Sequence, residues 1–150
     1  MAFRLTSPAF ADGADIPVRH TCDDSNISPA LTWTGVPERT RSLALIMDDP
    51  DAPRGVFTHW IVYNVAPAAG QLGEGVTPAS QGRNSFGRTG YGGPCPPAED
   101  NAHRYRFTLY ALDVGEIALT DGTREELEAR VEGHVVGTAQ LVGRYRRRQT

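Results

Sequence analysis

The stretch Ser42–Val65 reads SLALIMDDPDAPRGVFTHWIVYNV and contains two candidate strands joined by a stiff turn. Ser42–Met47 is a short continuous apolar run, and Thr58–Val65 is apolar on both alternating faces. Patterns of this kind are typical of strands in the middle of a sheet. The residue before each proline is pushed out of the helical region, so Pro50 and Pro53 favour a turn of defined shape. This stretch therefore predicts a central pair of strands.

The turn between the two strands also concentrates groups that can carry chemistry. If the strands are neighbours, Asp48, Asp49 and Asp51 lie near His59 at one end of the sheet. Carboxylates that only accept hydrogen bonds from nearby backbone amides are the simpler alternative for such a turn. A second histidine, His103, begins a later strand, but strand periodicity does not show whether it reaches the same end.

Two further segments have the pattern of strands. Tyr105–Leu112 alternates between apolar and more polar residues, which predicts a half-buried strand. Val135–Tyr145 is another candidate, in which Gly137 and Gly143 mark bulges or close contacts.

One short amphipathic helix is predicted near the C-terminus. Thr123 and Glu126 form a capping box, Leu127 and Val131 share one face, and Gly133 can close the helix in a left-handed turn. Several strands with one peripheral helix favour a mainly β fold, a β-sandwich with short peripheral helices, over alternating strands and helices.

Length and composition limit the classes of protein. With 150 residues, of which 39% are hydrophobic and 22% charged, the chain is expected to form a single globular domain over residues 1–150. A net charge of −3 argues against nucleic-acid binding, which needs a basic face. No segment approaches the roughly 20 apolar residues of a membrane span.

The cysteines and the N-terminal residues bear on the cellular compartment. The start, MAFRLTSPAF, lacks the apolar run of a signal peptide, so a cytoplasmic location is expected. Cys22 and Cys95 are too few for a disulfide scaffold. Free thiols are expected in the cytosol, and a single bridge stays open as the alternative.

The sequence contains no lysine, so all 15 basic residues are arginine. Schiff-base catalysis, Ser-Lys dyads and the Walker-type phosphate loop all require a lysine amine. These chemistries are therefore excluded.

The connection Ala66–His103 sustains neither a strand nor a helix period, and it contains the glycine- and proline-rich run GRNSFGRTGYGGPCPP. Long connections inside a domain are usually functional or disordered. Because proline restricts φ and glycine permits positive φ, this run can form a rigid loop of defined shape. A flexible surface insertion is the alternative.

Several motifs, taken in their order along the chain, point to one family. They are SPAF, HTCDDSNISPALTW, DDPDAP followed by THWIVYNV, and YGGPCPP followed by HRY. Together they resemble the phosphatidylethanolamine-binding proteins, and in particular their bacterial, Raf kinase inhibitor-like branch. The resemblance extends from about Ser7 to Tyr145 and departs from the family pattern at Asp24 and Asn101, where glycine is usual.

This resemblance implies a sandwich of two antiparallel sheets with a small anion-binding pocket at one end. The implied ligand is phosphate or a phosphoethanolamine-type head group, and the implied role is binding, without catalysis, metal or cofactor. Regulation of a kinase or protease partner and a homodimer are compatible with it. The residues that match the family's pocket, or lie close to it, are Asp49, Asp51, His59, Trp60, Tyr91, Pro94, Pro97, His103 and Tyr105.

Such a pocket suits a phosphorylated ligand, including a zwitterionic one, on chemical grounds. The imidazoles of His59 and His103 can donate hydrogen bonds to phosphate oxygens. Asp49 can raise the pKa of a neighbouring histidine, or it can receive the ammonium of phosphoethanolamine. Phosphate affinity should then weaken as the pH rises through the histidine pKa.

The competing hypothesis is a hydrolase that uses these histidines and aspartates, with or without a metal. Neither HExxH nor paired CxxC spacing is present, and no serine lies in a G-x-S-x-G motif. Cys95 could act as a nucleophile beside His103, although a packed structural thiol is the simpler interpretation.

Overall fold

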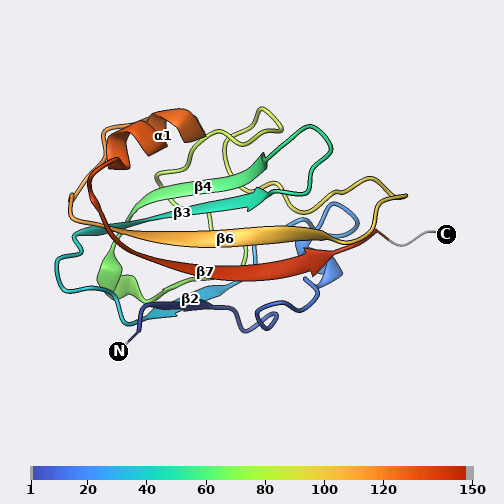
Figure 1. The fold of residues 1–150 in the computed structure, drawn as a ribbon, viewed down its shortest axis with the longest axis horizontal. Coiled ribbons are helices and arrows are strands. Elements are labelled where there is room, and N and C mark those ends of the chain that lie inside the picture. Colours follow the sequence, from blue (N-terminus) through green and yellow to red (C-terminus); the bar gives the residue numbers. More distant parts are fainter. Residues whose placement is uncertain (1, 148–150) are drawn as a thin grey trace.

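The computed structural model describes residues 2–147, and its larger sheet has four strands in the order β4–β3–β6–β7 (Figure 1). The strands are β3 (Ser42–Asp49), β4 (Phe57–Val65), β6 (His103–Leu112) and β7 (Val135–Tyr145). Each one pairs antiparallel with its neighbours. Strand β3 lies between β4 and β6 and is buried along its whole length, which explains its continuous apolar run. The strands predicted at these four places are confirmed.

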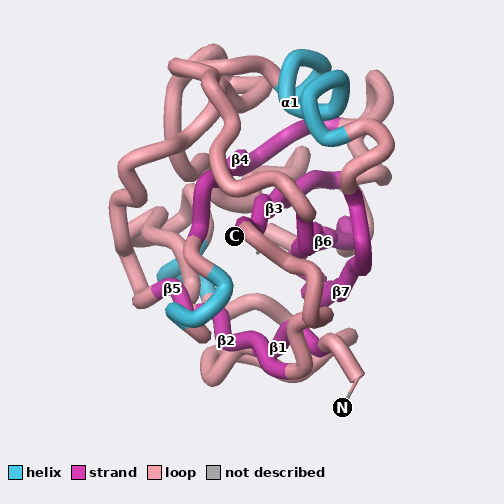
Figure 2. The backbone as a smooth tube through the Cα atoms, turned by 90° about the vertical axis from the view of Figure 1, so that its left-hand side faces the viewer, coloured by secondary structure: helices cyan, strands magenta, loops and turns pink. Residues whose placement is uncertain are grey.

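The smaller sheet contains three short strands in the order β1–β2–β5. These are β1 (Arg4–Thr6), β2 (Leu31–Thr34) and β5 (Gln71–Leu72). Viewed end-on, the larger sheet arches over this sheet (Figure 2). The predicted mainly β sandwich of two antiparallel sheets is therefore confirmed. The sequence did not reveal the short strands, because none is long enough to display an alternating pattern.

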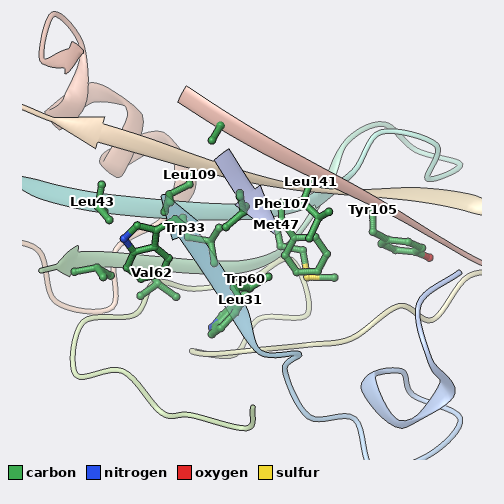
Figure 3. Close-up of a cluster of buried hydrophobic side chains, with 14 of the residues drawn as sticks. Leu31, Trp33, Leu43, Met47, Trp60, Val62, Tyr105, Phe107, Leu109 and Leu141 are labelled. Atoms are coloured by element: carbon green, nitrogen blue, oxygen red, sulfur yellow. The ribbon is translucent and has the colours of Figure 1, made fainter. Parts of the chain in front are cut away.

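The main hydrophobic core lies between the two sheets. Leu31 and Trp33 of β2 join Met47, Val62 and Phe107 of the larger sheet in one buried cluster (Figure 3). Full burial of one such side chain stabilises the fold by about 1.5–3 kcal/mol. This cluster therefore holds the smaller sheet against the larger one.

The helix α1 (Arg124–Val131) packs on part of the outer face of the larger sheet (Figure 1). The predicted capping box is present: the Thr123 hydroxyl accepts from the Glu126 amide at 3.2 Å, and the Glu126 carboxylate accepts from the Thr123 amide at 3.0 Å. Leu127 is buried against a second apolar cluster on this face, and Gly133 has φ of 80°. Single 3₁₀ turns occupy Val18–His20 and Pro67–Ala69. Within residues 2–147, no helix is long and apolar enough to cross a membrane.

Both glycines of β7 allow close packing, as predicted. A Cβ atom at Gly143 would overlap the side chain of Ile16, and one at Gly137 would lie 2.9 Å from a Pro37 ring carbon. Gly143 therefore lets the N-terminal segment lie directly on β7, and Gly137 does the same for the connection between β2 and β3.

The two cysteines form a disulfide, so the prediction of free thiols is wrong. Cys22 and Cys95 are 73 residues apart in sequence, and their Cα atoms lie 5.4 Å apart. Hydrogen bonds hold the two segments together: the Cys22 amide donates to the Pro94 carbonyl at 3.1 Å, and the Gly93 amide donates to the Asn26 side chain at 2.9 Å. The prediction of free thiols was based on the expected cytosolic compartment, and no local pattern shows that packing brings these two distant segments together.

Candidate ligand-binding site

The end of the larger sheet that carries the β3–β4 turn lies at the right of Figure 1. A cavity of about 180 Å³ opens at this end. Its walls come from three segments that are distant in sequence: this turn with the start of β4, the loop before β6, and β6 itself. The lining residues are Asp49, Ala52, Pro53, Phe57, His59, Phe86, Cys95, Pro96, Pro97, His103 and Tyr105.

A larger cavity of about 390 Å³ lies between α1 and the outer face of the sheet. Its walls are mostly apolar, with Ala44, Ile46 and Leu127 among them. The smaller cavity is the better candidate for a specific site, because several polar and titratable groups converge on it.

The antiparallel pairing brings the chemical groups together. Strands β4 and β6 both run opposite to β3 and flank it, so both begin where β3 ends. This arrangement places His59, near the start of β4, and His103, the first residue of β6, at the same end as Asp49. The sequence had left the relative position of the two histidines open.

A bulge in β4 turns His59 towards the cavity. Met47 pairs with Trp60 and Asp48 pairs with Thr58, so His59 is an extra residue without a direct partner on β3. In a regular strand, neighbouring residues point to opposite faces, which would have separated His59 from the side of Trp60. The bulge instead lets His59 line the same cavity as Asp49.

His103 is held between two carboxylates. Its Nδ1 lies 2.6 Å from an oxygen of Asp49, and its Nε2 lies 2.9 Å from an oxygen of Asp100. Burial by itself would lower the pKa of His103, but the hydrogen bonds and charges of the two carboxylates outweigh it and raise the pKa. Both ring nitrogens face acceptors, so the ring is an imidazolium that donates two hydrogen bonds.

His59 has the opposite character. Its Nδ1 lies 2.6 Å from the Gly92 carbonyl oxygen and therefore carries the proton that it donates. Burial lowers the pKa of His59 despite the carbonyl and the nearby Asp49. The ring is therefore neutral near pH 7, and its unprotonated Nε2 has the character of an acceptor.

Aromatic rings form the remaining walls around His59. Its ring centroid lies 5.0 Å from that of Phe57, 5.4 Å from that of Phe86 and 5.3 Å from that of Tyr105. Figure 3 shows Tyr105 at the end of the core cluster. Burial, with a smaller contribution from Asp49, raises the pKa of Tyr105, so its hydroxyl stays neutral and can donate a hydrogen bond.

Five of the nine predicted site residues line this cavity, namely Asp49, His59, Pro97, His103 and Tyr105. The other four, Asp51, Trp60, Tyr91 and Pro94, do not line it. Asp51 makes an ion pair of 2.8 Å with Arg104, and hydrogen bonds from this arginine lower the Asp51 pKa to about 2. Pro94 is buried behind the cavity wall and accepts from the Cys22 amide.

Trp60 and Tyr91 lie in the core behind the cavity. Trp60 is fully buried, and its indole nitrogen donates to Gln81 at 2.8 Å. The Tyr91 ring packs edge-on against Trp60 at 5.4 Å, and its hydroxyl donates to the His20 carbonyl at 2.6 Å. Both residues support the loop that forms one wall of the cavity.

Sequence reasoning missed several members of the site. Phe57 immediately precedes the predicted strand, and Pro96 lies inside the quoted proline run, so both had a local signal. Phe86 had none, because it reaches the cavity through the irregular loop. Asp100 could have been noticed three residues before His103.

The two departures from the family pattern lie outside the cavity lining. Asp24 is exposed and accepts a hydrogen bond from the Ser25 hydroxyl at 3.4 Å. Asn101 is exposed and, among the described residues, is not one with positive φ. Within residues 2–147, no group of three His, Cys, Asp or Glu side chains is arranged to hold a metal ion.

Comparisons with known proteins agree with this architecture. The family model described as phosphatidylethanolamine-binding protein matches residues 6–146. A Methanothermobacter thermautotrophicus relative named UPF0098 protein is 48% identical over 95% of this chain and 98% of its own length. A Mycobacterium tuberculosis relative that carries a lipoprotein name, LppC, is 45% identical over 94% of this chain and 71% of its own length.

A solved structure gives the same result for the fold. The crystal structure of CT736 from Chlamydia trachomatis, described as a homologue of phosphatidylethanolamine-binding proteins, is 42% identical and has a TM-score of 0.93. The match covers 98% of this chain and 99% of that one. Both the sequence and the sandwich with its terminal cavity therefore lead to one conclusion: this chain belongs to the phosphatidylethanolamine-binding protein family.

Proposed function

We propose that this protein binds a small phosphorylated ligand, such as phosphate or a phosphoethanolamine-type head group, in the cavity of about 180 Å³. One observation carries the proposal: an imidazolium and a carboxylate, His103 and Asp49, meet in a single small cavity. A zwitterionic head group needs opposite charges at close range, and this pair offers both.

Uncharged groups support the same ligand. The neutral Tyr105 hydroxyl is a donor for phosphate oxygens, and the neutral His59 is an acceptor for an ammonium group. The cavity is too small to bury acyl chains, so a head group is the better candidate than an intact phospholipid.

The other functional hypotheses rest on weaker grounds. Regulation of a kinase or protease partner and a homodimer follow from the family resemblance and are compatible with a small-ligand site. The hydrolase alternative has no support from the relatives described above, since none of their names denotes an enzyme.

The cytoplasmic location remains a prediction. Disulfides persist mainly in oxidising compartments, and one relative carries a lipoprotein name, so both observations weigh against it. Thiol labelling of the protein in freshly lysed cells would decide between a reduced and an oxidised pair.

The proposed site can be tested by filling it. Ala52 lines the cavity, so Ala52→Phe should occupy the space of the ligand, while Ala68→Phe places the same side chain on an exposed turn. We expect calorimetry at about pH 6 to detect saturable binding of O-phosphoethanolamine, tighter than that of phosphate or ethanolamine alone. Ala52→Phe should weaken it by about tenfold or more.

Ala68→Phe should bind like the wild type, and thermal unfolding should show that both variants are folded. Equal binding by Ala52→Phe would remove the ligand from this cavity. Absence of binding by the wild type to all three compounds would overturn the proposed function.

A further inference from the structure

The two carboxylates that contact His103 differ in how firmly they are held. Asp49 has a side chain that is only 5% exposed, and its second oxygen accepts from the Asp51 amide at 2.8 Å. Asp100 has a side chain that is 34% exposed, and it lies on a turn in which its amide donates to the Pro97 carbonyl at 3.1 Å. Asp49 is therefore a fixed partner, whereas Asp100 can turn into solvent.

The Asp100 carboxylate accepts the hydrogen bond from the ring nitrogen of His103 that an incoming anion would need. The His103 Nδ1 is already committed to Asp49 at 2.6 Å, so Nε2 is the remaining charged donor, and Asp100 takes it at 2.9 Å. The turn closed by the Pro97 carbonyl keeps this carboxylate beside a residue of the cavity wall.

The charges of these groups favour one kind of ligand over another. Asp49 and Asp100 each contribute one negative charge, His103 contributes one positive charge, and His59 is neutral. Two negative charges against one positive charge oppose the entry of a simple anion and favour an amine. Removal of Asp100 would leave one negative charge, on Asp49, and one positive charge, on His103.

We propose that Asp100 is a displaceable competitor for the anionic group of the ligand, and that it determines the preference of the pocket between simple anions and amine-bearing ligands. This inference rests on the proposed function of the same cavity. A phosphate must displace the Asp100 carboxylate from His103 Nε2 before it can accept that hydrogen bond. A ligand that also carries an amine offsets the cost of this displacement, because its positive charge lies near the carboxylates of Asp49 and Asp100.

The test compares Asp100→Ala with Glu99→Gln. Glu99 is an exposed acidic neighbour, so its substitution removes one negative charge from the same loop and leaves the contact with His103 in place. Calorimetric titration with inorganic phosphate at about pH 6 should show that Asp100→Ala binds about tenfold more tightly than the wild type. Glu99→Gln should differ from the wild type by less than about twofold, because exposed charges are screened. Titration with ethanolamine should show weaker binding by Asp100→Ala.

Each result has a separate meaning. Unchanged phosphate affinity in Asp100→Ala, with the wild type binding phosphate, would overturn this inference and leave the proposed function standing. Equal gains in both variants would also overturn it, because the cause would be general charge and not the contact with His103. Absence of phosphate binding in the wild type and in a folded Asp100→Ala variant would overturn this inference, and it would overturn the proposed function as well if neither protein binds O-phosphoethanolamine or ethanolamine. Binding of phosphate by the Asp100→Ala variant alone would support this inference, and the proposed function would then depend on binding of O-phosphoethanolamine by the wild type.

Discussion

His103 and His59 line the same cavity and are held in different protonation states. Two carboxylates raise the pKa of His103, whereas burial lowers the pKa of His59. The cavity therefore combines a charged donor with a neutral acceptor only because each ring has different neighbours. Pairs of titratable groups whose environments separate their pKa values are a common feature of functional sites.

His103 should make the stability of the protein depend on pH. Its pKa is raised in the folded state by Asp49 and Asp100, so its contribution is fully present below the unfolded pKa of about 6.5. The contribution is lost as the pH rises through the folded pKa, because the unfolded chain then releases the proton first. We expect the wild type to exceed His103→Gln in free energy of unfolding by more at about pH 5.5 than at about pH 8.5.

Urea unfolding of both proteins at the two pH values measures this difference. The opposite contribution of His59 cancels, since both proteins retain it. His134→Gln serves as the control, because His134 makes only an exposed ion pair with Asp113. A difference between the wild type and His103→Gln that is the same at both pH values would contradict the prediction.

At the scale of elements, the site depends on a bulge and a close-packed loop. The bulge at His59 changes the side to which this residue points without interrupting β4. The loop before β6 is tied to β4 through the Gly92 amide, which donates to the His59 carbonyl at 3.0 Å. Together they place the loop wall against His59.

Gly93 should be essential for the docking of this loop. A Cβ atom at Gly93 would overlap the His20 carbonyl oxygen and the Asn26 side chain. We expect Gly93→Ala to lower the free energy of unfolding by about 1–3 kcal/mol, because backbone atoms would have to move. Gly73→Ala is the matched control, since a Cβ there meets nothing within 4 Å. Equal urea midpoints for the two variants would show that the loop tolerates the extra atom.

At the scale of the whole molecule, the disulfide joins the N-terminal region to the cavity wall. The Cys22–Cys95 bridge closes a loop across 73 residues and ends at a residue that lines the cavity. The bridge thereby links the stability of the fold to the position of this wall.

Removal of the bridge should destabilise the protein. A chain-entropy estimate for a loop of this length is about 4 kcal/mol, and measured losses are typically about 2–4 kcal/mol. We expect a Cys22→Ser, Cys95→Ser double variant to lose stability in this range in urea unfolding. Dithiothreitol should lower the stability of the wild type and leave the variant unchanged. Identical unfolding curves of the oxidised and reduced wild type would contradict the prediction.

The sequence by itself determined the parts of the fold that show a local pattern. The buried run of β3, the alternation in β6 and the capping box at Thr123 and Glu126 each depend on residues that are neighbours along the chain. The motif resemblance led to the family and to five of the residues that line the cavity.

Only the tertiary structure decided which groups meet. It paired Cys22 with Cys95 and brought His103 to the end of the sheet where His59 lies. It also placed the Asp100 carboxylate against the Nε2 atom of His103. The physical reason is that periodicity depends on neighbouring residues, whereas burial, charge and hydrogen bonding in the cavity depend on segments far apart in sequence. The shorter strands and the bulge in β4 belong to the same class, because packing between the sheets, and no local pattern, determines them.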